Sequence, residues 1–482
     1  MNIPNKLIYD LIYTELADIV GPEYITRRRV DKLAYAVDYS WVSQMWIDRG
    51  QEPPTADFIL FPRNAQEISE IIRVANTHRL PVVPWGGASG SQGGVIPLYG
   101  GIIIDLKRLN RIIEIDEESL TVTAEAGIIG QKLEWELNER GLTLAHYPAS
   151  EYAATLGGYI AARGSGTLST KYGKAEDMVM WIKLVSPTGE IIETLPVPNH
   201  ASGPGLLELF VGSEGTLGII VEVKMRVDPL PEERRFQSFL FEDLNKGIEA
   251  GRRIMAQRLN PCVIRLYDEV DTKKYVKRVL NLDVTGSYMV IGVDGFRELN
   301  DVIWKKIFEI CKDLGGQDLG SEAGQKWWDH RYDFYFPPFA KALPKLFGTI
   351  ETVTTFKNIR PLYYAAKEIV EKKYGDYGAS FFAHFSHWYP WGVMVYAQFM
   401  IDDPPQDPEL VLNLHNRIWA DTAKCFIANG GVLNEHHGIG LKLGWLMRKQ
   451  YGPAWPKMVD IKNAFDPNGI MNPGKLGFGP PK

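Results

Sequence analysis

The sequence predicts an α+β fold, with a mixed N-terminal domain and a second domain in which helices cover an antiparallel sheet. Three observations support this class. A strand–helix–strand pattern comes early in the first 228 residues, alternating strands follow it, and longer amphipathic helices interleave with strands after Pro229. At 482 residues the chain is also too long for one hydrophobic core, so more than one domain is expected.

The strand–helix–strand pattern lies at residues 56–106. Phe58–Phe61 has the composition of a strand, and Pro62 closes it. The apolar residues that follow recur at helical spacing: Ala65, Ile68, Ile71, Ile72 and Ala75. Residues 81–85 and 101–106 then predict two further short strands. Strands that alternate with a helix in this order favour a parallel α/β unit.

The rest of the N-terminal domain has the alternating pattern of strands. Residues 181–185 and 190–193 predict a hairpin, because Ser186–Gly189 places proline and glycine where a β-turn favours them. The other expected elements are two strands within residues 110–127, a helix over 128–140 that Gly141 ends, a short helix over 206–210 and a strand over 217–227.

The second domain is expected to begin at the turn Pro229–Glu233. It combines amphipathic helices with strands that pair as an antiparallel sheet, and its clearest elements are helices over 244–258, 299–314, 362–373 and 410–428 and strands over 287–293 and 392–400.

The C-terminal tail, residues 464–482, is too rich in glycine and proline for helix or strand and is expected to run back across another part of the molecule. The predicted domains are therefore 1–228, 229–435 and a C-terminal segment 436–482 that returns to the first domain.

Composition excludes several classes of protein. The net charge of −6 gives no electrostatic reason to bind nucleic acid or an anionic membrane. No apolar run reaches the roughly 18 residues of a transmembrane helix. The first 20 residues are typical of an amphipathic surface helix and not of a signal peptide, so a cytoplasmic protein is expected.

The three cysteines, Cys262, Cys311 and Cys425, are scattered without paired spacing. This spacing excludes a cysteine-ligated iron–sulfur cluster within the chain and disfavours a disulfide framework. An enzyme of this kind that moves electrons needs an organic cofactor or a partner protein.

Two aromatic clusters, Trp327-Trp328 and Phe334-Tyr335-Phe336, are expected in the core, with the lining of a pocket as the alternative.

Three glycine-rich segments carry the main functional signal. The first, residues 85–94 (WGGASGSQGG), follows a strand, and its exposed N–H groups can form an anion-binding nest for a pyrophosphate. It is neither a Walker loop nor a clean GxGxxG. The second, residues 148–173, lets main chain pass beside a flat ring such as an isoalloxazine. The third is residues 212–220. Any one of them alone is explained by a surface turn, but three within about 130 residues point to a dinucleotide.

At this point the sequence resembles the flavin oxidoreductases of the vanillyl-alcohol oxidase and p-cresol methylhydroxylase type. The resemblance runs from about Pro54 to the C-terminus, and three segments carry it: PASEYAATLGGYIAARGSG, GSEGTLGII and FDPNGIMNPGK. Within this superfamily the chain is most similar to alkyl-dihydroxyacetone-phosphate synthases and to D-lactate or glycolate dehydrogenases. The resemblance implies a two-lobed FAD-binding domain of the p-cresol methylhydroxylase type, followed by a substrate domain.

The resemblance also implies which residues hold FAD. The pyrophosphate would lie on Trp85, Gly86, Gly87, Ala88, Ser89, Gly90 and Gly93. The ribityl chain and flavin ring would lie along Pro148, Ser150, Thr155, Gly157, Gly158, Ala161 and Gly164. The adenine side would be completed by Glu214, Gly215, Gly218 and Ile220. Some relatives attach FAD covalently through a histidine. The first loop has none, so non-covalent FAD is expected, and His146 is the one histidine near the second loop.

The late histidines suggest either a metal site or an acid/base site. His384 and His387 lie three apart, but Pro390 and Gly392 favour loop and strand there, not a helix. Lactate-type relatives have a GDGNLH-like metal motif, which is missing here, and His436 stands where they carry a glutamate. We therefore expect no metal.

The HHG run and the neighbouring SHWYPWG look instead like the alkyl-phosphate synthases. By that match Tyr389, His436 and His437 are candidate acid/base groups and Arg265 is a candidate anion-binding residue, or else one half of an ion pair with Asp268. His384 falls where those synthases carry an arginine, which weakens the case for a phosphate substrate.

Oxidation of an alcohol by a flavin requires a base and a group that holds the substrate in place. A neutral histidine takes the O–H proton of an alcohol as hydride leaves carbon, and an arginine fixes a substrate carboxylate. The favoured interpretation is that the protein is an FAD-dependent dehydrogenase or oxidase of a D-2-hydroxy acid such as lactate or glycolate. The alternatives are a synthase-like flavin transferase, an electron-relaying subunit and an oxidase of an aromatic alcohol. The expected partners are a small-molecule substrate, an electron-acceptor protein or quinone, and a second copy of the chain.

Overall fold

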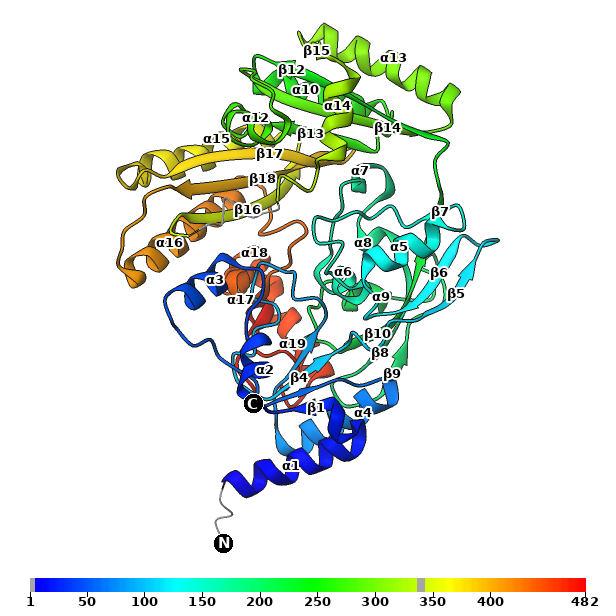
Figure 1. The fold of residues 1–482 in the computed structure, drawn as a ribbon, viewed down its shortest axis with the longest axis vertical. Coiled ribbons are helices and arrows are strands. Elements are labelled where there is room, and N and C mark those ends of the chain that lie inside the picture. The colour runs from blue at the N-terminus through cyan, green and yellow to red at the C-terminus, as the bar shows by residue number, and fades with distance from the viewer. Residues whose placement is uncertain (1–4, 336–342) are drawn as a thin grey trace.

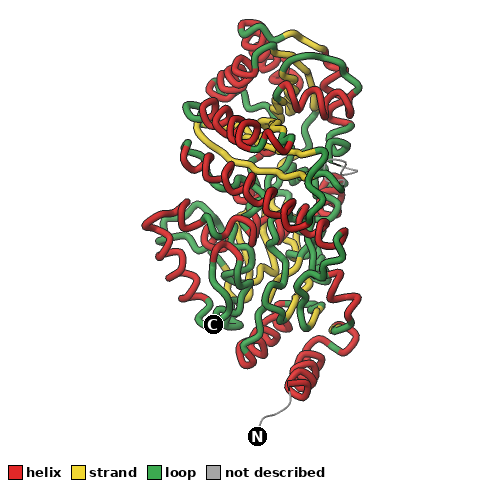
Figure 2. The backbone as a smooth tube through the Cα atoms, turned by 90° about the vertical axis from the view of Figure 1, so that its left-hand side faces the viewer, coloured by secondary structure: helices red, strands yellow, loops and turns green. Residues whose placement is uncertain are grey.

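The computed structural model describes residues 5–335 and 343–482. Two sheets built mainly from the first 228 residues form the lower part of the molecule in Figure 1, and a seven-stranded sheet forms the upper part. The view from the side shows these parts stacked along the long axis (Figure 2).

The first lobe is the expected parallel α/β unit. Its sheet has the order β1 (Ile25–Thr26), β2 (Phe58–Leu60), β4 (Ile102–Asp105) and β3 (Val82–Trp85), with β2, β4 and β3 parallel. Helix α4 (Ala65–His78) begins after Asn64, whose side chain accepts from the N–H of Glu67. Ile68, Ile71, Ile72 and Ala75 of its apolar stripe are buried, and α1 (Asn5–Val20) packs on the helix.

The second lobe is an antiparallel sheet of five strands. Its order is β5 (Ile112–Asp116), β6 (Thr121–Glu125), β10 (Ile219–Arg226), β8 (Val179–Val185) and β9 (Ile191–Glu193). The predicted hairpin is confirmed as the β8–β9 pair. Short helices lie between its strands: α5 (Gly130–Asn138), α6 (Leu156–Ala162), α7 (Ser169–Tyr172), α8 (Ala175–Met178) and α9 (Leu207–Phe210).

The upper sheet is antiparallel throughout, as expected. Its order is β15 (Gln317–Leu319), β12 (Glu233–Phe241), β14 (Ser287–Gly295), β13 (Val263–Tyr267), β17 (Ser380–Trp388), β18 (Gly392–Ile401) and β16 (Leu346–Thr355). The helices that pack on it are α10 (Leu244–Ala256), α13 (Arg297–Asp313), α14 (Gly320–Asp329), α15 (Ile359–Glu368) and α16 (Pro408–Ala428).

Alternation along β17 gives the upper sheet two different faces. Phe381 and Phe385 pack against Tyr363 of α15, while His384 and Ser386 point to the opposite face and line a large cavity. Successive strand residues point to opposite faces, so this one strand both closes the core and builds a site.

The C-terminal tail lies against the first lobe. The N–H of Val82 donates to Ile470 O at 2.8 Å, and the N–H of Asn472 donates to Val82 O at 2.8 Å. The buried Lys475 ammonium donates to Ile96 O at 2.7 Å, next to the first glycine loop. The red end of the chain beside the blue strands in Figure 1 is this contact. The domain limits at residues 229 and 436 stay a prediction.

In the described part of the chain, no helix is both long and apolar enough to cross a bilayer.

One close contact in the upper core yields a stability test. A Cβ on Gly251 of α10 would lie 2.2 Å from the ring of the fully buried Trp388. Alanine in a helix ordinarily stabilises by about 0.5–1 kcal/mol over glycine, whereas overpacking a core costs about 1–3 kcal/mol. G251A is therefore expected to lower the free energy of unfolding by about 1–2 kcal/mol in urea titrations. Gly375 has no atom within 4 Å of its Cβ position, so G375A is the matched control. Equal stability of G251A and the control would contradict this packing.

Candidate active site

A single cavity of about 770 Å³ joins the three glycine loops to the face of the upper sheet. All but two of the site residues expected from the sequence line it. The exceptions are Gly93 and Tyr389. The loops and the late histidines, which lie as far apart in the chain as Trp85 and His437, therefore line one continuous space.

The first glycine loop lines one end of the cavity with main chain. Among the described residues, none accepts a hydrogen bond from the N–H groups of Gly87, Ala88, Ser89 or Gly90. Gly93 instead donates its N–H to the buried Asp38 carboxylate at 2.7 Å, which holds the end of the loop. The free N–H groups are the donors that an anion-binding nest requires.

The first two glycine loops contact each other closely. A Cβ on Gly87 would lie 1.9 Å from Ala153 O, so only glycine allows this approach. Helix α6 starts in the second loop, where the Thr155 side chain accepts from the N–H of Gly158. The glycine content is thus required by packing as well as by any ligand.

Glu214, in the third glycine segment, contacts the turn that follows the histidine pair. Its carboxylate accepts from the N–H of Ile439 at 2.5 Å and from the N–H of Gly440 at 2.8 Å. Burial raises the pKa of Glu214 to about 7, against these hydrogen bonds. The third segment therefore fixes one end of the histidine turn.

Glu351 of β16 fixes the other end of that turn. One of its oxygens accepts from the N–H groups of Glu435, His436 and His437, at 3.4, 2.9 and 2.9 Å. The other lies 2.8 Å from Nδ1 of His436 and 3.1 Å from Nδ1 of His437. Burial opposes the charge, but the two histidines hold the pKa of Glu351 well below its usual range.

His436 lies between two buried carboxylates. Its Nδ1 is 2.8 Å from Glu351 and 2.8 Å from Glu435. Burial lowers its pKa, but the two carboxylates outweigh burial and raise it to about 9. His436 is therefore a fixed imidazolium near pH 7.

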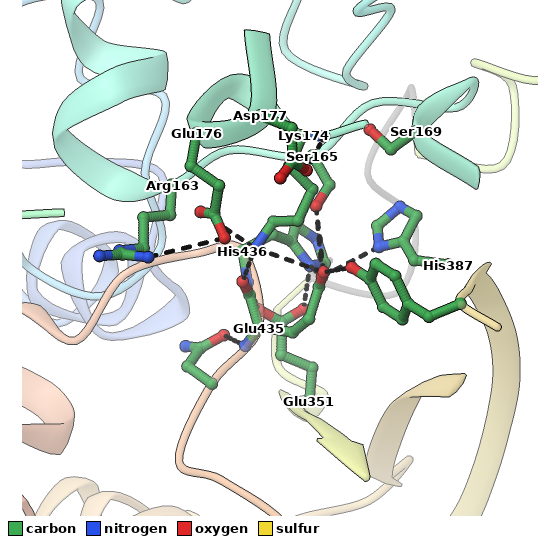
Figure 3. Close-up of polar contacts among 12 residues, drawn as sticks. Arg163, Ser165, Ser169, Lys174, Glu176, Asp177, Glu351, His387, Glu435 and His436 are labelled. Atoms are coloured by element: carbon green, nitrogen blue, oxygen red, sulfur yellow. Dashed lines mark hydrogen bonds and ion pairs between the residues drawn. The ribbon is translucent and has the colours of Figure 1, made fainter. Parts of the chain in front are cut away.

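Several polar groups behind the cavity contact the carboxylate of Glu435. His387 Nδ1 lies 2.9 Å from its carboxylate, Lys174 Nζ lies 3.4 Å away, and the Tyr389 hydroxyl donates to it at 2.5 Å. Figure 3 shows His387, His436, Lys174 and Ser165 directed at this one carboxylate. The Tyr389 hydroxyl is thus engaged away from the cavity, although it was expected there as an acid/base group.

A row of four side chains on one face of the upper sheet crosses four strands, and three of them, Tyr267, His384 and Tyr396, line the cavity. Tyr267 of β13 is the register partner of His384 in β17, His384 pairs with Tyr396 in β18, and Tyr396 pairs with Glu351 in β16. Directly paired residues point to the same face, so these side chains adjoin. The His384 ring stacks on Tyr396 with centroids 4.7 Å apart.

Arg265 projects from β13 into the same space. It is buried, and its guanidinium lies 5.8 Å from the centre of the Trp327 ring and 5.9 Å from that of Tyr335. No ion pair joins it to Asp268 within the described ranges, since Asp268 instead accepts from Asp271, Ala383 and Tyr363.

The aromatic clusters divide between core and cavity. Trp327, Phe334 and Tyr335 line the cavity, whereas Trp328 stacks on Phe236. Phe336 lies outside the described residues.

Two family models match the chain in these same regions. A model for the FAD binding domain matches residues 56–195, and a model for the C-terminal domain of FAD linked oxidases matches residues 230–476. The chain belongs to the FAD-linked oxidases.

Relatives of this FAD-linked oxidase carry several activities in their names. Alkyldihydroxyacetonephosphate synthase of Trypanosoma brucei brucei is 28% identical over 99% of this chain and 82% of the relative. Glycolate oxidase subunit GlcD of Bacillus subtilis (strain 168) is 27% identical over 96% of both. A probable mitochondrial D-lactate dehydrogenase of Danio rerio is 28% identical over 88% of this chain and 84% of the relative.

Solved structures agree with this membership. A structure of alkyldihydroxyacetonephosphate synthase superposes with a TM-score of 0.81 at 26% identity, covering 97% of this chain and 86% of that one. A structure of p-cresol methylhydroxylase with substrate bound gives 0.81 at 17% identity, covering 99% and 98%, and shows the shared fold.

FAD is the cofactor of this family, and the cavity fits it. The unpartnered N–H groups of residues 87–90 suit a pyrophosphate, and the second and third glycine segments bring main chain to the cavity wall, where a flat ring can lie against it. The assignment of individual residues to parts of FAD stays a prediction.

His146 was the one histidine that could attach FAD covalently. Its ring is buried edge-on to Tyr159, and it lines a separate pocket of about 10 Å³ instead of the large cavity. Burial lowers its pKa to about 3. This position favours non-covalent FAD, which stays a prediction.

Two groups of metal-capable side chains overlap in the histidine cluster. Glu351, His436 and His437 form one, and His387, Glu435 and His436 form the other, each with ligand atoms within 4.8 Å of one another. Most of these groups already hydrogen-bond to each other or to backbone N–H groups. The expected absence of a metal stays a prediction.

Sequence reasoning missed Tyr396, Glu351 and Asp271, which adjoin the predicted histidines. Tyr396 and Glu351 leave a weak signal in the sequence, whereas Asp271 lies in a helix and leaves none of this kind. Thr349 and Glu351, and likewise Tyr396 and Gln398, are polar residues two apart within apolar strands. Polar side chains at this period on a buried strand indicate a face that lines a site.

Non-covalent attachment can be tested directly. Precipitation of the yellow holoenzyme with trichloroacetic acid is expected to release all of its FAD into the supernatant, because His146 lies outside the large cavity. Absorbance of the supernatant and of the redissolved pellet measures the two fractions. Flavin that stays with the pellet in wild type but not in H146A would show a covalent bond.

The raised pKa of His436 predicts that its contribution to the stability of the folded state depends on pH. Between its unfolded value near 6.5 and its folded value of about 9, the native state holds an additional proton. This contribution is present below the unfolded pKa and is lost as pH rises through about 9. The melting temperature of E351Q, relative to wild type, should therefore be lowest near pH 6 and approach wild type near pH 9.5. E368Q, at an exposed ion pair, is the control. A difference that does not change with pH would refute the paired imidazolium.

Proposed function

We propose that this FAD-linked oxidase oxidises a small D-2-hydroxy acid such as lactate or glycolate. The observation that carries the proposal is the shared cavity, where a buried arginine and a pair of histidines face the FAD-binding loops. The named activities of the glycolate oxidase subunit and of the D-lactate dehydrogenase support the same substrate class.

In this proposal each residue has a separate task. Arg265 binds the substrate carboxylate through two parallel hydrogen bonds. His437, which lines the cavity and is the more exposed of the two histidines, takes the hydroxyl proton. His436 stays protonated and holds the turn, and Tyr389 positions Glu435. Bound FAD supplies the hydride acceptor, and an electron-acceptor protein or a quinone completes the cycle.

A second candidate is a flavin transferase like the alkyldihydroxyacetonephosphate synthases. The similarity over 99% of this chain favours it as strongly as any relative favours the first. A transferase would act without an external electron acceptor. A third candidate, an oxidase of aromatic alcohols, draws on Trp327, Phe334 and Tyr335 in the cavity.

One experiment separates these candidates. The holoenzyme is mixed anaerobically with D-lactate, glycolate and an aromatic alcohol, and the flavin absorbance is followed. Bleaching by a hydroxy acid is expected. Bleaching only by the aromatic alcohol would support the third candidate, and no bleaching by any of them would overturn the proposal.

The role of His437 is tested with the same assay. H437A is expected to slow flavin reduction at least about 100-fold, the usual contribution of a general base, while its FAD content stays unchanged. H330A, at an exposed histidine, should reduce at the wild-type rate. Turnover by H437A at the wild-type rate would show that another group takes the proton.

A further inference from the structure

A buried aspartate–histidine pair lies at the substrate end of the cavity. Nδ1 of His384 is 3.1 Å from Oδ2 of Asp271. The side chains are 6% and 1% exposed, and both residues line the cavity. Asp271 ends α11 (Glu269–Asp271), directly before the π-helical turn η2 (Thr272–Val276). Such turns occur frequently at functional sites.

The pair is held rigidly in this position. Asp268 accepts from the N–H of Asp271 at 2.7 Å and from the N–H of Ala383 at 2.8 Å, so one carboxylate fixes both neighbouring segments. The His384 ring stacks on Tyr396 and lies 5.4 Å from the Tyr267 ring. Neither Asp271 nor His384 can move without disturbing these contacts.

One polar atom of the pair is left for a ligand. Nε2 of His384 is buried and has no hydrogen-bond partner among the described residues. A buried ring nitrogen without a hydrogen-bond partner is energetically unfavourable. The residue lines the cavity, so a bound molecule is the partner that this atom can reach.

The electrostatics of the pair place a proton on that atom. Burial and the nearby Arg265 hold the pKa of His384 well below its usual range. Burial and Asp268 raise the pKa of Asp271 well above its usual range. The pair is thus neutral overall and shares one proton between Oδ2 and Nδ1, which leaves the ring proton on Nε2 as a donor.

Arg265 is the one lysine or arginine among the cavity-lining residues that the structure describes. His436 is compensated by Glu351 at 2.8 Å, and Arg265 has no carboxylate within ion-pair distance in the same ranges. Among the described residues that line this end of the cavity, Arg265 therefore offers one positive charge without an ion-pair partner, and His384 offers one neutral N–H donor, while the charged Asp268 lies behind Asp271 and outside the lining.

We infer that Asp271 and His384 form, with Arg265, a receptor for a singly charged carboxylate that discriminates against phosphate esters. Arg265 neutralises the carboxylate, and the Nε2–H of His384 donates to the same substrate. Asp271 is a positioning residue, because it acts by orienting the ring and fixing its tautomer. The inference rests on the proposed function and narrows its substrate class to hydroxy monocarboxylates.

The discrimination follows from charge. A carboxylate carries one charge, which Arg265 balances, whereas a phosphate monoester carries about two near neutral pH. The second charge would be buried beside a neutral pair, and an uncompensated buried charge is strongly unfavourable.

The test measures binding by calorimetry to the holoenzyme. The probes are 2-hydroxyisobutyrate, which has the carboxylate and hydroxyl but no hydrogen for hydride loss, and glycerol 3-phosphate. Wild type is expected to bind the carboxylate at least about tenfold more tightly, a difference of about 1.4 kcal/mol. Equal or tighter binding of the phosphate ester would overturn the inference.

Variants of Asp271 test whether this residue positions the His384 ring or only stabilises the fold. D271A should weaken 2-hydroxyisobutyrate about tenfold, while D271N, whose amide can still donate to Nδ1, should stay within about threefold. The double variant D271N/H384R adds a net positive charge and should bind glycerol 3-phosphate more tightly than wild type does. D333A, at an exposed aspartate–histidine pair 2.7 Å apart, is the matched control and should bind like wild type. Wild-type affinity in D271A, or equal losses in D271A and D271N, would refute the positioning role.

The experiments distinguish failure of the proposed oxidation from failure of the proposed carboxylate receptor. If no hydroxy acid bleaches the flavin but the two probes and the variants behave as expected, the oxidation is wrong and the receptor stands. If a hydroxy acid bleaches the flavin while D271A binds 2-hydroxyisobutyrate like wild type, the receptor is wrong and the oxidation stands.

Discussion

The buried carboxylate of Glu351 is the interaction on which the arrangement of the site depends. A carboxylate is costly to bury unless hydrogen bonds and opposite charge compensate it. Here three consecutive N–H groups of the turn 435–437 and two histidine rings supply that compensation. The turn therefore has one low-energy position against β16, and both histidines are placed by it.

Glu214 gives the same turn a second anchor from the other part of the molecule. Its carboxylate accepts from Ile439 and Gly440, while Glu351 accepts from residues 435–437. A Cβ on Gly438, between the two anchors, would lie 2.7 Å from Glu214, and Gly438 has φ +77°. Because one carboxylate comes from the third glycine segment and the other from the upper sheet, the turn connects the glycine segments to the face of the sheet that lines the cavity.

The sequence predicted correctly those elements that a pattern among neighbouring residues determines. Local periodicity located α4, the β8–β9 hairpin and α16, since each is decided by neighbouring residues. The glycine segments indicated FAD because glycine is needed wherever main chain approaches a ligand or another loop, as at Gly87 and Ala153. Asp271 could not be found in this way, and the polar period of β16 does not show which residues Glu351 adjoins. Glu351 meets Tyr396 through strand register, whereas Asp271 meets His384 through the packing of α11 on β17. A single sequence reveals neither contact.

Tyr389 and Tyr396 show how one irregularity decides which side chain reaches the cavity. Strands β17 and β18 pair regularly up to Phe385, but a register shift separates Phe385 from Trp388. A bulge of this kind redirects the side chains that follow it. Trp388 packs under Gly251 in the core and Tyr389 turns to Glu435, whereas Tyr396, which pairs with His384 before the shift, faces the cavity. Motif matching selects the tyrosine beside the histidines in the sequence, while the bulge assigns the cavity position to the tyrosine across the strand pair.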